Sequence, residues 1–93
     1  MNKRYESVVE ILREQNPDAL LADGFEDALV GVADRFGIEP VALYDRGRCL
    51  RILMDRDGLS SEDAFEHMSY NVEGAWVGEG TPIFCDLADN LAD

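Results

Sequence analysis

Apolar side chains near the start of the chain recur at helical spacing, with acidic residues between them. The apolar set is Tyr5, Val8, Val9 and Leu12, and the acidic set is Glu6, Glu10 and Glu14. Steps of three and four positions place each set on its own face, which predicts an amphipathic helix. Asn16-Pro17 is expected to end this helix, because a residue that precedes proline disfavours the helical conformation.

Two short apolar runs follow, at residues 28–33 and 41–44. Asp23-Gly24, ahead of the first run, is a turn signal. The run 28–33 has no clear period and is compatible with a strand or with the start of a helix; we favour a strand. Residues 36–40 would then connect the two runs, which are expected to pair as an antiparallel hairpin.

Two more helices are predicted between Asp45 and Gly74. Asp45 can cap the first, and Asp57-Gly58 can close it. Ser60 with Asp63, or Ser61, resembles a capping box for the second. The predicted buried positions are Cys49, Leu50, Leu53 and Met54 in the first helix, and Ala64, Phe65, Met68 and Val72 in the second.

Residues 75–84 are expected to form a loop that returns into a last strand, and the acidic tail 86–93 is expected to fray. The length of 93 residues suits one domain. The pattern therefore predicts a single α+β domain over 1–93. Its short antiparallel sheet, the hairpin plus the C-terminal strand, would pack against three helices.

Charge narrows the classes of function. The chain has 20 acidic and 8 basic residues, a net charge of -12, and Lys3 is its only lysine. One interpretation is adaptation to concentrated salt in a halophilic host, since surface carboxylates keep a protein hydrated and self-repelling. Ordinary acidity and a functional acidic surface are the alternatives. Direct binding to a nucleic-acid backbone is disfavoured, because that affinity depends on Lys and Arg.

Membrane and metal chemistry are not indicated. No signal-peptide apolar region follows the basic first residues, and no apolar run reaches membrane-spanning length. Cys49 and Cys85 lack CxxC spacing and the chain has a single histidine, which is poor material for zinc. Free thiols are favoured over one disulfide, and a cytoplasmic location is expected.

Three familiar motifs fail when their spacing, charge or structural context is tested. With Gly58 as the sixth residue of a calcium loop, the first and twelfth positions fall on Leu53 and Ala64, which cannot ligate. A helix-turn-helix reader of DNA would need basic side chains on its second helix, where acidic ones dominate. Gly78-Glu79-Gly80 lacks the strand and helix context of a phosphate loop.

Carboxylates and the single histidine supply the candidates for catalysis. Asp23, Glu26 and Asp27 lie together near a predicted turn, where carboxylates can act as acids or bases. His67 is expected at the surface, paired with a carboxylate such as Asp63 one turn away. A small carboxylate-dependent hydrolase or nuclease is therefore one alternative function.

Residues 70–82 hold the candidates for protein binding. Trp76 is bracketed by glycines, and it can be either a core side chain or an anchor of an interface. Tyr70, Asn71 and Glu79 flank it. We take Trp76, Tyr70, Asn71 and Glu79 as the candidate protein-binding residues.

Four sequence blocks carry a resemblance over residues 24–84. They read GFEDAL (24–29), PVALYD (40–45), ILMDRDG (52–58) and, over 70–84, YNVEGAWVGE followed by TPIF. In this order the blocks resemble a group of short uncharacterised proteins of tailed viruses of prokaryotes and of their bacterial or archaeal hosts. The resemblance implies a small viral or host accessory protein and carries no activity or catalytic residue.

The sequence thus favours a non-enzymatic protein-binding or regulatory module. Its partner would be another protein or a second copy, with no cofactor, metal, membrane or direct nucleic-acid binding. The alternatives are an acidic nucleic-acid mimic that inhibits a host protein, and the hydrolase or nuclease above.

Overall fold

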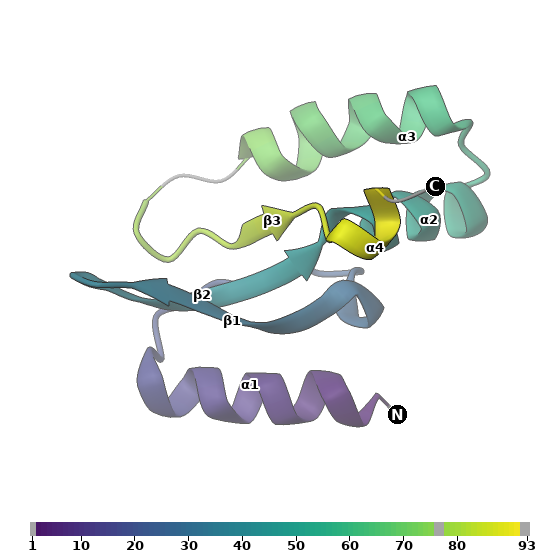
Figure 1. Cartoon of the computed structure of the whole chain (residues 1–93). Helices are drawn as coiled ribbons and strands as arrows, with labels where there is room; N and C mark the ends of the chain where they lie inside the picture. The colour runs from purple at the N-terminus through teal and green to yellow at the C-terminus, as the bar shows by residue number, and fades with distance from the viewer. Residues whose placement is uncertain (1, 76–77, 92–93) are drawn as a thin grey trace.

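The computed structural model describes residues 2–75 and 78–91, with a three-stranded sheet between helices (Figure 1). Its elements are α1 (Lys3–Gln15), β1 (Leu29–Arg35), β2 (Ile38–Asp45), α2 (Arg46–Asp57), α3 (Ser61–His67), β3 (Ile83–Cys85) and α4 (Ala88–Leu91). Short helical turns add η1 (Glu26–Ala28), η2 (Met68–Val72) and η3 (Glu73–Ala75). Figure 1 shows α1 on one side of the hairpin and α3 on the other.

The helix α1 forms as its apolar spacing predicts. The side chain of Asn2 accepts a hydrogen bond in the first turn, and Val8 and Leu12 are buried. Asn16 ends the helix, and its side-chain Nδ2 donates to the carbonyl of Pro40 at 2.8 Å. Because Asn16 is itself buried, this hydrogen bond ties the end of α1 to the start of β2.

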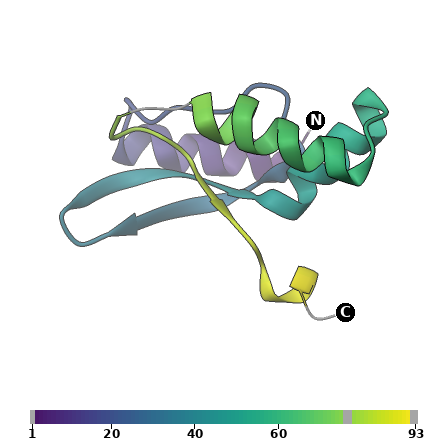
Figure 2. The ribbon, with the colours of Figure 1, turned by 90° about the horizontal axis from the view of Figure 1, so that it is seen from above.

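The hairpin confirms the two predicted strands but has a tighter turn than expected. The predicted connection 36–40 is wrong, because Phe36-Gly37 alone forms the turn and β2 already begins at Ile38. Gly37 has φ +86°, which suits a two-residue hairpin loop. Pro40 is tolerated within β2 beside a register shift of the β1–β2 pairing. Figure 2 shows the hairpin reaching beyond both long helices.

The third strand joins the sheet in the opposite sense to that expected. The order is β1-β2-β3, with β2 antiparallel to β1 and β3 parallel to β2. The sheet is therefore mixed, and the antiparallel pairing predicted for the C-terminal strand is wrong. The physical reason is the crossover: α2 and α3 return the chain to the starting end of β2 before β3 forms. The α+β class itself is confirmed.

The predicted caps in the second half are confirmed, but the helix expected to run to Gly74 ends as α3 at His67 and continues as η2 and η3. The Asp45 side chain accepts from the Gly47 N–H, Gly58 closes α2 with φ +70°, and Ser60 Oγ accepts from the N–H at residue 63. Two of the predicted buried positions are wrong. Phe65 and Met54 are exposed, because each lies one position off the buried stripe of its helix. The tail predicted to fray contains α4.

Tyr44 lies at the centre of the core. Its ring is fully buried and stacks on Phe84, with the ring centroids 5.4 Å apart. Its hydroxyl accepts a hydrogen bond from the Ala22 N–H at 2.8 Å. This contact joins β2 to the loop that precedes η1 and gives a buried backbone N–H its partner.

Replacing Tyr44 with Phe is expected to lower the free energy of unfolding by about 1–3 kcal/mol, because the Ala22 N–H loses its acceptor. Tyr70→Phe is the matched control, since that hydroxyl is at an exposed position. Urea unfolding at neutral pH measures both. Equal stability of the two variants would contradict this role of the hydroxyl.

The same tyrosine predicts a change of stability with pH. Burial raises the pKa of Tyr44 from 10.0 to about 12. The folded state therefore favours the protonated phenol. This stabilisation is complete below pH 10 and is lost as pH rises through about 12. The difference in unfolding free energy between wild type and Tyr44→Phe should shrink over that interval, and a constant difference would argue against it.

Candidate functional site

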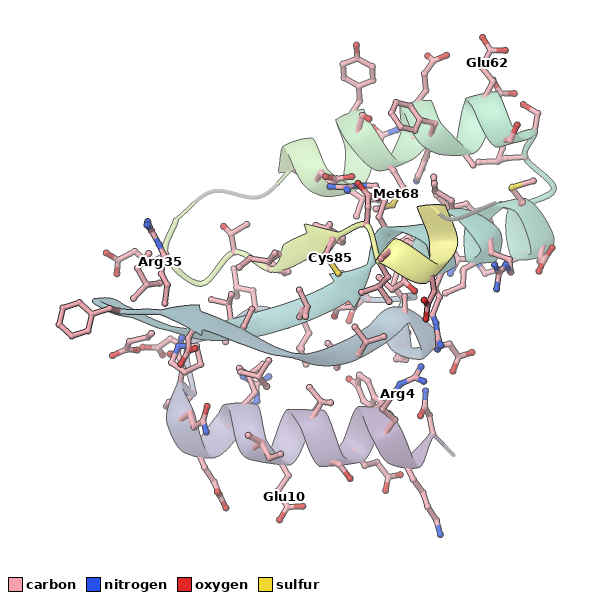
Figure 3. All side chains as sticks on the ribbon, in the orientation of Figure 1. Arg4, Glu10, Arg35, Glu62, Met68 and Cys85 are labelled. Carbon is pink, nitrogen blue, oxygen red and sulfur yellow. The ribbon has the colours of Figure 1, made fainter. Side chains whose placement is uncertain are left out.

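One side of α3 and its continuation is polar and aromatic rather than packed. We call the exposed residues Glu62, Phe65, Glu66 and Tyr70 the outer face of α3. Phe65 is 57% exposed and Tyr70 is 77% exposed. In Figure 3, Glu62 points away from the molecule while Met68 points toward the sheet. The two aromatic rings thus project to solvent from a segment whose other side is core.

A wider helical turn positions Tyr70 on this face. The segment η2 is a π-helical turn, in which the N–H of Glu73 bonds to the carbonyl of Met68, five residues back. In this turn Met68 and Val72 are buried and Tyr70 is exposed. Turns of this kind occur often at functional sites.

The structure brings together only part of the predicted protein-binding set. Tyr70 and Asn71 are neighbours on η2 and both are exposed. Glu79 lies in the turn at 78–80 and lines a hollow of about 420 Å³ beside the hairpin, away from the residues of α3. Trp76 lies outside the described residues.

His67 has a different partner from the one expected. Its Nδ1 lies 3.3 Å from the Asn71 side-chain nitrogen, four residues on, and no ion pair joins it to Asp63 across the described ranges. An imidazole held by an amide has no carboxylate to orient it. The prediction that His67 pairs with a carboxylate is therefore wrong, because its partner is the Asn71 side chain.

The predicted acidic cluster is divided by the fold. Glu26 and Asp27 line a cleft of about 590 Å³ against α2, whereas Asp23 and His67 do not line it. Within residues 2–75 and 78–91, no group of three His, Cys, Asp or Glu side chains could hold a metal ion. The four candidate catalytic residues do not form one site.

The same cleft contains arginines that the sequence reading did not single out. Arg48, Arg51 and Arg56 line it from α2, together with Ile52 and Asp55. Arg48 and Arg51 lie three positions apart, on the side of α2 opposite the buried Cys49 and Leu53, and Arg56 follows five positions later in the last turn. This spacing was the signal in the sequence, and the partner loop that completes the cleft was not visible there.

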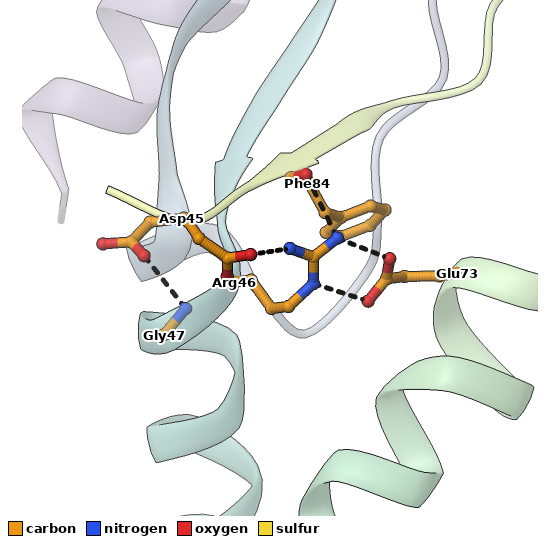
Figure 4. Close-up of polar contacts among 6 residues, drawn as sticks. Asp45, Arg46, Gly47, Glu73 and Phe84 are labelled. Carbon is orange, nitrogen blue, oxygen red and sulfur yellow. Dashed lines mark hydrogen bonds and ion pairs between the residues drawn. The ribbon is translucent and has the colours of Figure 1, made fainter. Parts of the chain in front are cut away.

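Arg46, the first residue of α2, connects η3 to the C-terminal strand (Figure 4). Its guanidinium donates to both carboxylate oxygens of Glu73, at 2.9 and 2.8 Å, and to Asp86 at 2.7 Å. It also donates to the carbonyl of Phe84 at 3.2 Å. These hydrogen bonds, that to Glu73 above all, raise the pKa of Arg46. We call Arg46 with Glu73 and Asp86 the Arg46 bridge, and it holds the base of the outer face in place.

Both thiols are free, as expected. Cys49 is buried, and its burial raises the pKa of the thiol to about 12. Cys85 is half-buried, and burial raises its pKa as well. Because the reactive form is the thiolate, both are poor nucleophiles at neutral pH.

No helix found in the described ranges is both long and apolar enough to cross a membrane. Comparison with known proteins found no matching family model, no similar curated protein and no similar solved structure.

Proposed function

We propose that this chain is a non-enzymatic protein-binding module, and that the outer face of α3 is its contact surface. The observation that carries the proposal is the pair of exposed aromatic rings on one short helical segment, Phe65 and Tyr70. Aromatic side chains are enriched among the residues that dominate interface energies. Apolar area left in water is a cost that binding recovers, at about 25 cal/mol per Å².

The charges around the rings indicate what kind of partner fits. Glu62, Asp63 and Glu66 are exposed on the same helix. Complementary charge steers association and sets the register of an interface. The partner is therefore a protein with an apolar pocket rimmed by basic side chains, into which the two rings insert.

The scaffold supports this use. Ala64, Met68 and Val72 anchor the segment in the core, so the rings project from a fixed backbone. The hairpin tip also presents an aromatic side chain, Phe36, which is fully exposed. Phe36 is a single ring in a two-residue turn, whereas Phe65 and Tyr70 both project from one helical segment that is anchored in the core. Two anchors on a rigid segment make the better binding surface.

The two alternative functions have less support. A nucleic-acid mimic needs one concentrated acidic face, yet exposed carboxylates lie on α1, the hairpin, α2 and α3 alike. The hydrolase hypothesis was built on Asp23, Glu26, Asp27 and His67, and the cleft that holds Glu26 and Asp27 contains neither Asp23 nor His67. We therefore propose binding rather than catalysis.

The test is photo-crosslinking in cells of the natural host. A benzophenone amino acid is placed at position 65 or 70 in two variants, and at Ile11 in a control. Ile11 is 47% exposed on α1, on the other side of the sheet. The same crosslinked protein is expected from positions 65 and 70 but not from 11. Identical products from all three positions, or products from position 11 alone, would refute the proposed surface.

We further propose that the acidic composition is adaptation to salt, which the spread of carboxylates over the surface supports. The melting temperature should rise by several degrees between about 10 mM and about 1 M KCl, as the Debye length falls from about 30 to about 3 Å. Circular dichroism measures it, and glucose at equal osmolality controls for volume exclusion. A melting temperature that does not depend on KCl would contradict the proposal. The free thiols support the cytoplasmic location predicted from the sequence.

A further inference from the structure

The cleft between α2 and residues 24–27 is a second candidate binding site, besides the outer face of α3. It measures about 590 Å³, within the range of small-molecule sites of about 300–1,000 Å³. Three of the eight basic residues of this acidic chain line it, together with three carboxylates. The cleft is therefore close to neutral, with both signs of charge facing the same space.

One edge of the cleft is fixed. Arg56 donates to the carbonyl of Gly24 at 2.8 Å, pairs with Asp57 at 3.0 Å, and lies over the Phe25 ring. Gly24 has φ +90°, and a Cβ there would come within 2.9 Å of the Arg56 guanidinium. Glycine thus lets the loop approach α2 closely enough to form the cleft wall.

The opposite edge is also held. Arg48 pairs with the buried carboxylate of Asp45 at 3.3 Å. On the loop side, the carboxylate of Asp27 accepts a hydrogen bond from Asn2 at 2.9 Å. These contacts engage Arg48, Arg56 and Asp27 and leave three of the six charged residues that line the cleft.

Three charges of the cleft form no direct contact with another charged or polar side chain in the described part of the chain. Arg51, Asp55 and Glu26 make no side-chain hydrogen bond or ion pair there, and Glu26 interacts with the charge of Arg56 only at longer range. Arg51 and Asp55 are four residues apart on α2, a spacing at which opposite charges usually pair. Both instead face the cleft, with the apolar Ile52 between them.

We propose that this cleft binds a small zwitterion of the α-amino acid class. The carboxylate of the ligand pairs with Arg51, whose planar fork suits bidentate binding of that group. Its ammonium group pairs with Asp55, with Glu26 opposite on the loop. A ligand with one charge alone leaves a like charge facing it across the cleft, so both charges are needed. This site is separate from the outer face of α3 and does not depend on the function proposed for that face.

The experiment is a titration of the isotopically labelled full chain, followed by amide chemical shifts. Each standard L-amino acid is added to about 10 mM, ten times the dissociation constant of a weak millimolar complex. We expect at least one to give saturable shifts at Gly24, Arg51, Ile52 and Asp55. The N-acetyl and the amide forms of the same amino acid, which lack one charge each, should bind at least tenfold more weakly.

Two variants and two controls complete the test. Arg51→Met and Asp55→Asn should each raise the dissociation constant at least tenfold. Arg35→Met and Glu10→Gln, at exposed positions of the hairpin and of α1 (Figure 3), should leave it unchanged. The proposal is overturned if no amino acid gives saturable shifts in the cleft. It is equally overturned if the singly charged forms bind as tightly, or if the cleft variants bind like the controls.

Discussion

Replacing Arg46 with Met is expected to lower the free energy of unfolding by about 2–4 kcal/mol, the largest loss of stability we predict for a polar residue. The variant removes four hydrogen bonds, three of them to carboxylates. The carboxylate of Glu73, 27% exposed, is left without its cation. Leaving a partly buried charge unpaired costs more than the ion pair contributes.

Loss of the Arg46 bridge should also loosen β3 before the rest of the sheet. That strand pairs with β2 through three residues, and Arg46 binds it at the carbonyl of Phe84 and, directly after the strand, at the carboxylate of Asp86. Urea unfolding measures the global loss. Amide hydrogen exchange of residues 83–85 measures the local loss, which should exceed that of β1 and of the first part of β2.

Controls separate geometry from charge. Arg46→Lys keeps the charge but not the two-pronged contact with Glu73, so its stability should fall between wild type and Arg46→Met. Arg35→Met removes an exposed arginine and should change stability by no more than about 0.5 kcal/mol. If Arg46→Met proves as stable as Arg35→Met, the Arg46 bridge does not hold the C-terminal strand.

The second large effect concerns binding. Phe65→Ala and Tyr70→Ala should each weaken the complex with the crosslinked partner at least tenfold, since truncating a central anchor costs about 2 kcal/mol or more. Neither variant should lose stability, because both rings lie outside the core. Calorimetric titration measures the affinity.

One control truncates an apolar side chain on another helix, and a further variant reverses a charge on α3. Ile11→Ala, which truncates an exposed apolar residue on α1, should leave the affinity unchanged. Glu66→Lys should slow association and weaken the dependence of its rate on salt, because the partner is expected to be basic. If Ile11→Ala weakens binding as much as the aromatic variants, the contact surface is not on α3.

Local signals in the sequence predicted much of the fold. The 3.6-residue period of α1, the cap at Asp45, the left-handed glycine at position 58 and the cap at Ser60 each depend on residues within one or two turns. Such interactions are encoded by adjacent residues, and the structure confirms them. The α+β class follows from the same elements.

The errors concern interactions between distant segments. The direction of β3 depends on how far α2 and α3 carry the chain back along β2. No local sequence pattern predicts that distance. Phe65 was assigned to the core with Ala64, Met68 and Val72, yet it lies one position off their buried stripe and faces solvent. Arg46 and Glu73 are 27 positions apart, and no local pattern around Arg46 predicts that they pair.

The candidate site was predicted in part for the same reason. Tyr70 and Asn71 were singled out from their own sequence context. Tyr70 belongs to the outer face of α3, and Asn71 is its exposed neighbour in the chain. The spacing of the arginines on α2 was visible in the sequence. Only the structure shows that they line a cleft, because the loop at Gly24 lies against α2. Glu79 was grouped with Tyr70 by sequence proximity, and the fold places it beside the hairpin.

The claim that the outer face of α3 is the contact surface is tested most directly by amide hydrogen exchange, with the chain alone and bound to its crosslinked partner. We predict slower exchange over residues 61–72 in the complex and unchanged exchange in α1 and at the hairpin tip. Protection confined to α1 or to residues 34–39, with none over 61–72, would contradict it.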